Sequence, residues 1–221
     1  ITIHKGNFKN LFKTVRSIQK QHLKPDLHLI VINKISFNHS QIFMNKYTKL
    51  IINKDHSIYH AMNLALKKTF DYNVIFINSG DELDKSDTIK IIKSKILHNK
   101  CLIFKTKVID GNKCYHPSKN FHQNKNYSPH PSFIRPPVTK NKIFYMNESI
   151  KISADSEWIK KCIKTFNVKK IEVFSSKFYT GGISTKPSIK SIIHQTIYSF
   201  RDGIKEFIKY VIYKLFKKYY F

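Results

Sequence analysis

The sequence predicts an α/β fold in which helices cover a largely parallel β-sheet. Strand-like and helix-like segments alternate along the first half of the chain, as is typical of parallel sheets. Two strand-like segments, 27–32 and 74–77, are almost continuously apolar, as expected of strands that are buried on both faces. The length of 221 residues suits one domain with a small appendage.

The first half contains four expected strands and two expected helices. The strands are residues 1–3, 27–32, 49–52 and 74–77. Apolar residues at helical spacing predict an amphipathic helix over about 9–21. Ser57 is a suitable N-cap for a second helix, whose apolar positions follow the i, i+3, i+4 pattern: Ile58, Ala61, Met62, Ala65 and Leu66.

The second half mixes helices, strands and loops. Ser86 opens a helix with Ile89, Ile92 and Ile96 on one face. Asp110-Gly111-Asn112 is a hairpin signal between expected strands 101–108 and 113–116. The Pro-, Asn- and His-rich segment 117–137 is expected to be irregular, and a helix (155–165), a strand (171–174) and a glycine loop (181–182) follow.

The C-terminal stretch differs from the rest and divides the chain into an expected catalytic domain, 1–187, and an expected helical tail, 188–221. The tail carries an apolar stripe bordered by lysines and tyrosines, as one helix or as two broken near Asp202-Gly203. Such a stripe suits an amphipathic helix in an anionic membrane interface, and a helix packed on the domain or in a dimer remains the alternative.

Charge and cysteine content narrow the class of protein. The net charge of +26 predicts attraction to a polyanion: nucleic acid, an anionic membrane or a phosphorylated substrate. Three cysteines without metal-like spacing fit a reducing cytosol, and Cys101 and Cys162 are expected to fill the core. The sequence has no signal-peptide pattern and no apolar run long enough to cross a bilayer.

The strongest chemical signal is Asn78-Ser79-Gly80-Asp81, which directly follows the apolar strand 74–77. Open α/β sheets bind ligands at the carboxyl ends of their strands. A carboxylate there can hold Mg²⁺ or Mn²⁺, which need only one or two protein carboxylates when a diphosphate is also bound. Asp81 is therefore the metal-ligand candidate, and the alternative is that it only caps the turn or the helix that opens near Ser86.

Asp55 to Asn63 and the 78–81 loop together resemble the core of the family 2 glycosyltransferases, which transfer a sugar from a nucleotide diphosphate. Ser57 stands where that family has Gly, and His60 where it has Asp. Further islands in the same order are His130-Pro131-Ser132-Phe133-Ile134-Arg135, Ala154-Asp155 and Gly181-Gly182-Ile183-Ser184. The loop after the second strand, 31–36, lacks the family's Asp.

The resemblance implies a GT-A fold, an inverting transfer with Mn²⁺ or Mg²⁺, and a role for each matching residue. It makes Asp155 the general base and Asp81 with His130 the metal ligands. It implies contacts with the nucleotide sugar from one set of residues: Asp55, Tyr59, Asn63, Asn78, Ser79, Arg135, Gly181 and Gly182.

The expected function is transfer of a sugar from a nucleotide-diphosphate donor to a saccharide or lipid-diphosphate-linked saccharide in surface polysaccharide biosynthesis, such as that of lipopolysaccharide. The enzyme is expected in the cytoplasm, on the inner face of the cell membrane, and an oligomer is left open. One rival is a basic nucleic-acid-binding protein, although no motif of that class occurs and no nucleic acid is expected. The other is a degenerate glycosyltransferase that binds without turnover.

Overall fold

The computed structural model describes residues 1–33, 45–55, 57–115, 130–150 and 154–181, and four residues of the C-terminal stretch: 204, 207, 208 and 211. Most of the expected tail, Gly182 and the loop after the second strand lie outside the described residues. No described helix is both long and apolar enough to pass through a bilayer.

A parallel sheet forms the N-terminal half, as predicted. Strands β1 (Thr2–His4), β2 (His28–Asn33) and β3 (Thr48–Asn53) pair in parallel in the order β1-β2-β3. The segment around β4 (Val74–Ile75) continues this sheet beyond β1, because Ile77 N–H donates to Ile1 C=O over 2.9 Å and Ser79 N–H to Ile3 C=O over 3.1 Å. The resulting order is β3-β2-β1-β4.

A second sheet continues from β4 in the order β4-β8-β6-β9-β5, with β7 paired to β6. Its strands are β5 (Glu82–Leu83), β6 (Lys100–Asp110), β7 (Lys113–Tyr115), β8 (Phe133–Arg135) and β9 (Asn167–Tyr179). β8 is antiparallel to both β4 and β6, and β9 is parallel to β6. The carboxyl ends of β1, β4, β6 and β9 therefore meet at one edge.

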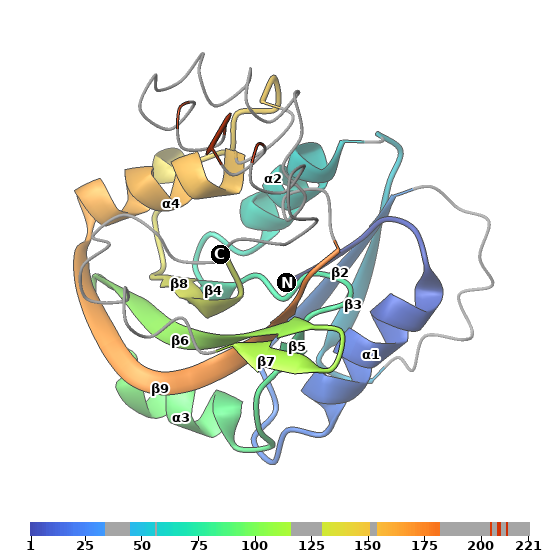
Figure 1. The fold of residues 1–221 in the computed structure, drawn as a ribbon. Helices are drawn as coiled ribbons and strands as arrows, with labels where there is room; N and C mark the ends of the chain where they lie inside the picture. The colour runs from blue at the N-terminus through green and yellow to red at the C-terminus, as the bar shows by residue number, and fades with distance from the viewer. Residues whose placement is uncertain are drawn as a thin grey trace.

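Helices cover both faces (Figure 1). α2 (Ile58–Lys68) and α4 (Ala154–Thr165) lie over one face, and α1 (Phe8–Gln19) and α3 (Thr88–Lys95) over the other. The side chains of successive β2 residues therefore point to opposite faces of the sheet: Val31 packs in the core with α2, and Ile30 packs in the cluster with α1. Short 3-10 turns occur at His130–Ser132 and Lys140–Lys142.

Trp158 of α4 anchors the largest core. Its ring packs edge-on against Phe76 and Phe133 at centroid distances of 5.7 and 5.6 Å, and its Nε1 donates to Phe144 C=O over 2.8 Å. Cys101 and Cys162 are fully buried, which confirms their expected place in the core.

Three strands differ from the sequence-based expectation. β8 forms inside the segment expected to be irregular, because Phe133, Ile134 and Arg135 are buried between β4 and β6. β9 extends far beyond 171–174, since a register shift near Phe174 lets a long, bent strand follow β6. β5 has only two residues and gave no periodic signal.

Candidate active site

The candidate site lies at the carboxyl edge between β1 and β4, where the strand order reverses. Open α/β sheets bind ligands at such a switch point. His4, the last residue of β1, bonds through Nδ1 to Ser79 Oγ at 2.9 Å and so links the two strand ends. Burial lowers the pKa of His4 below its ordinary value, so the ring is neutral at pH 7.

The loop 78–81 is held by Thr14 of α1. The Thr14 hydroxyl lies 2.7 Å from Asp81 C=O, and it accepts from Gly80 N–H over 3.0 Å. Gly80 has φ +110°, a conformation that side-chain-bearing residues rarely adopt. The loop predicted from the sequence thus has a defined shape, and Thr14 is a residue that the sequence did not single out.

Removing this hydroxyl gives a first testable result. Thr14→Val keeps the side-chain volume but removes the donor to the buried Asp81 C=O, which costs about 1–3 kcal/mol, while Gly80 N–H keeps its bond to Asn10 C=O at 3.2 Å. Urea unfolding should show this loss, with weaker nucleotide binding. The matched control is Thr165→Val. The exposed Thr165 hydroxyl bonds to the carbonyl four residues back, Lys161 C=O, just as Thr14 Oγ1 lies 3.2 Å from Asn10 C=O. Equal losses in both variants would contradict a special role for Thr14.

Asp81 is buried, 5 % exposed, at the end of this loop. Its Oδ1 accepts from the backbone N–H of Tyr179 over 3.1 Å, which joins the end of β9 to the loop after β4. Gly181, two residues later, has φ +104° and is exposed. The structure therefore brings Asn78, Ser79, Asp81 and Gly181 to one edge of the sheet.

Three side chains pack beside Asp81. Lys13 Nζ lies 2.9 Å from the Tyr179 ring centroid and 3.5 Å from Glu82 Oε2, and Tyr179 OH donates to the same Glu82 oxygen. Desolvation lowers the pKa of Lys13, while desolvation and then the Glu82 bond raise that of Tyr179. This cluster fixes the end of β9 against α1.

The turn into α2 carries the next candidates. Asp55 is exposed, and its Oδ1 accepts from Ser57 N–H over 2.8 Å. Ser57 caps α2 as predicted, accepting from His60 N–H. Buried Asn53 binds both the N–H and the C=O of Asp55, so it shapes this turn. Tyr59 is half-buried against the main core.

The Asn63 side chain bonds to the segment before α4. Its amide exchanges hydrogen bonds with the backbone of Met146, at 2.9 and 2.8 Å, and donates to Glu148 Oε1 over 2.7 Å. Glu148 also pairs with His60 at 3.0 Å. Asn63 and His60 thus tie the segment before α4 to α2.

Asp155 lies in the first turn of α4, half-buried, with Oδ1 accepting from Ser156 N–H over 3.0 Å. The helix leads into β9, which runs parallel to β6, so the start of α4 faces the same edge as the loop 78–81 (Figure 1). A carboxylate in the first turn is also stabilised by the helix dipole.

Arg135 does not reach the site. It pairs with Val74 at the beginning of β4, and its buried guanidinium donates to the carbonyls of Thr69, Phe70 and Pro136. The guanidinium thus caps carbonyl groups at the end of α2. His130 begins a 3-10 turn, but its side chain, like Gly182, lies outside what the structure describes.

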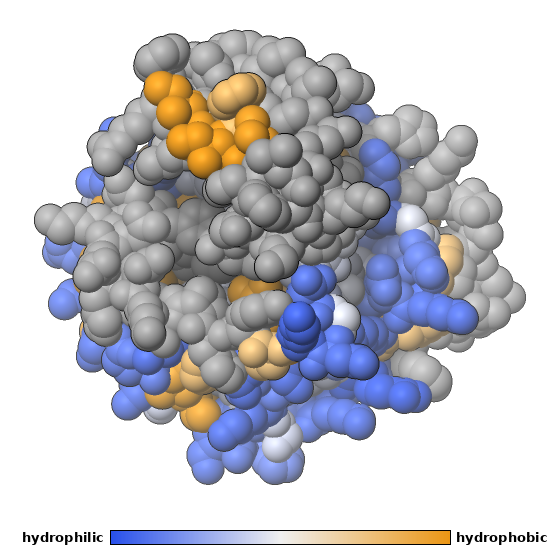
Figure 2. Space-filling model, viewed as in Figure 1, coloured by the Kyte–Doolittle hydropathy of each residue, from blue (hydrophilic) through white to orange (hydrophobic). Residues whose placement is uncertain are grey.

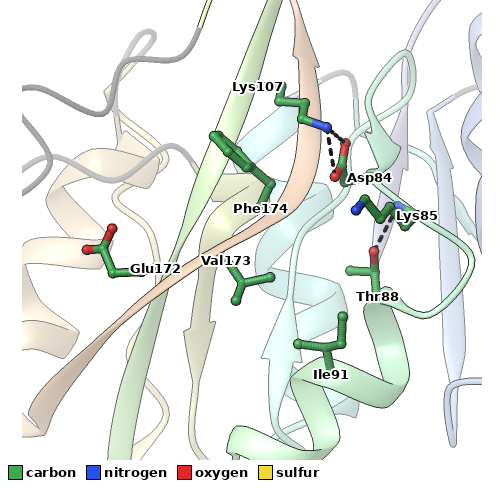
Figure 3. Close-up of a pocket in the computed structure, with 8 residues that line it drawn as sticks. All are labelled: Asp84, Lys85, Thr88, Ile91, Lys107, Glu172, Val173 and Phe174. Carbon is green, nitrogen blue, oxygen red and sulfur yellow. Dashed lines mark hydrogen bonds and ion pairs between the residues drawn. The ribbon is translucent and has the colours of Figure 1, made fainter.

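Two hollows among the described residues lie elsewhere. A groove of 290 Å³ opens between Ile1, Asp71 and Ile92, near the amino ends of the strands. The other, of 240 Å³, lies between α3 and β9 (Figure 3). Its buried Asp84 is paired with Lys107 at 2.7 Å, so these two charges neutralise each other.

No model of a known protein family and no curated protein sequence matches the chain. Solved structures, however, do match its fold. The UDP complex of S. aureus TarS residues 1–349 superposes with a TM-score of 0.71 at 18 % identity, over 93 % of this chain and 64 % of that one. Its UDP-GlcNAc complex gives 0.68 at 16 %, over 96 % and 71 %.

This chain therefore has the α/β fold of TarS. At this low identity the likeness establishes the fold alone, and it bears out the expected GT-A architecture. The chain spans 42 % of a longer TarS structure, at a TM-score of 0.67 and 16 % identity.

Two residues that shape the site escaped the sequence analysis, Asn53 and Thr14. Asn53 had a detectable signal, because it is a polar residue that ends an apolar strand at the same sheet edge. Thr14 acts through contacts between segments far apart in the chain, which no local pattern reveals.

Proposed function

We propose that this chain is a family 2, inverting glycosyltransferase that uses a uridine-diphosphate sugar. The observation that carries the proposal is the loop 78–81, held by Thr14 at the switch point between β1 and β4. The UDP and UDP-GlcNAc complexes of the structurally similar TarS support a uridine donor.

Asp81 would hold Mg²⁺ or Mn²⁺ against the donor diphosphate. The described residues contain no group of three metal-ligating side chains. One carboxylate nevertheless fits an ion that takes most of its oxygen ligands from water and phosphate. When bound, such an ion would stabilise the negative charge that develops on the leaving diphosphate. His130 stays a second ligand candidate.

Asp155 would act as the base. The acceptor hydroxyl forms a bond to the anomeric carbon while the bond from that carbon to the diphosphate oxygen breaks. The hydroxyl proton passes to Asp155, and the diphosphate leaves with the bonding electrons. Attack opposite the leaving group inverts the anomeric carbon. The proposed acceptor is a saccharide or a lipid-diphosphate-linked saccharide of surface polysaccharide biosynthesis, at the cytoplasmic face of the membrane.

A thermal-shift panel of UDP-, GDP-, dTDP- and CMP-sugars, each with and without Mn²⁺, tests this function. A ligand at about 100 times its Kd adds about 2.7 kcal/mol to the free energy of unfolding. In a chain of this size that raises Tm by roughly 5–10 °C. We expect a Mn²⁺-dependent rise with UDP-sugars only.

The other possible outcomes of this panel would support one of the two rival functions. A shift without any sugar transfer or donor hydrolysis would indicate a degenerate glycosyltransferase. No shift with any nucleotide, together with salt-sensitive binding of RNA or DNA, would favour a nucleic-acid-binding protein.

A further inference from the structure

An exposed apolar patch lies on the C-terminal stretch. Ile204, Phe207 and Ile208 are helical and are 46, 55 and 51 % exposed, and half-buried Val211 follows at the same helical spacing. Figure 2 shows this patch as an orange area near the top of the molecule. We refer to these four residues as the tail patch.

We propose that the tail patch docks on an anionic lipid surface. This inference rests on the proposed function, because it would bring the enzyme to a lipid-linked acceptor.

The charge around the patch in the sequence complements such a surface. Residues 188–221 contain seven basic and two acidic residues and five tyrosines. Each Lys or Arg near an anionic leaflet adds to the attraction between the chain and that leaflet. Tyrosine suits the membrane–water interface because its ring is apolar while its hydroxyl can form hydrogen bonds with water. The basic residues of the tail are Lys190, Arg201, Lys205, Lys209, Lys214, Lys217 and Lys218.

The charge of the chain and the small size of the tail patch disfavour a second copy of the chain as the partner that covers the patch. Two chains of net charge +26 repel each other. A stable dimer buries about 800 Å² on each partner, and four side chains provide only a small part of that area. An interfacial helix needs only an apolar face and a basic border, without spanning the membrane.

Co-sedimentation of the full chain with vesicles tests the inference. The probes are phosphatidylcholine vesicles with and without phosphatidylglycerol. We expect binding to the anionic vesicles, weakened by salt, and at least a tenfold loss on the combined change Ile204→Ser, Phe207→Ser and Ile208→Ser. The control Leu23→Ser with Tyr72→Ser removes exposed apolar side chains elsewhere, 40 and 38 % exposed, and should bind as the parent chain does.

Three results would overturn the proposal: no binding by the parent chain, equal binding by the patch variant, or a dimer that the patch variant turns into a monomer. Thermal shift with the donor panel keeps the two proposals apart. Binding of a UDP-sugar without binding to vesicles would refute only the membrane inference. Binding to vesicles without binding of any nucleotide would refute the proposed function. Unchanged Tm in the variants shows that they fold.

Discussion

Asp155→Asn is expected to lower the rate of sugar transfer by about 10²–10⁴-fold, the usual contribution of a general base. The amide keeps the size of the side chain and can still accept from Ser156 N–H, so α4 should start as before. Because the expected donor contacts lie on other elements, the affinity for the UDP-sugar should change little. Initial rates and calorimetric donor binding measure the two effects separately.

Glu157→Gln is the matched control. Glu157 is a second acid in the first turn of α4, and its contact with Lys161 at 3.9 Å is a weak surface pair. Both changes remove one negative charge from the same end of α4. A loss of rate that came only from the interaction of this charge with the helix dipole would therefore appear in both variants. If Asp155→Asn keeps more than about a tenth of the parent rate, or if the two variants lose rate equally, Asp155 is not the base.

Much of the fold could be predicted because its signals are local. The apolar spacing of α1 and α2 and the Ser57 cap depend only on neighbouring residues. β8 could not be predicted, because its three residues form a strand only between β4 and β6. The extent of β9 likewise depends on its long pairing with β6.

The candidate site shows a different limit. Sequence predicts which polar residues end a strand or begin a helix, and Asp81 and Asp155 lie at such positions. It does not show where a polar side chain finds its hydrogen bonds. Arg135 and Asn63 bind main-chain groups of their own chain, and these partners are distant in sequence.

Lys107→Met is expected to cause the largest loss of stability. Lys107 pairs with Asp84, whose side chain is only 1 % exposed, so the variant leaves a buried carboxylate without its counter-charge (Figure 3). Breaking a buried pair from one side costs about 3–5 kcal/mol. In a chain of this size that lowers Tm by roughly 6–20 °C, measurable by calorimetry.

Lys105→Met is the matched control, since both lysines lie near the Phe174 ring, at 6.0 and 5.3 Å for Lys105 and Lys107. Lys105 pairs with Glu172, which is 48 % exposed, so water can replace the lost partner and the cost should stay below about 1 kcal/mol. Adding Asp84→Asn to Lys107→Met removes the unpaired charge and should restore most of the lost stability. If both single variants unfold at the same temperature, water reaches Asp84 and the pair does not secure the segment after β5 to β6. A large loss that Asp84→Asn does not repair would instead assign the effect to the packing of the Lys107 side chain on Phe174.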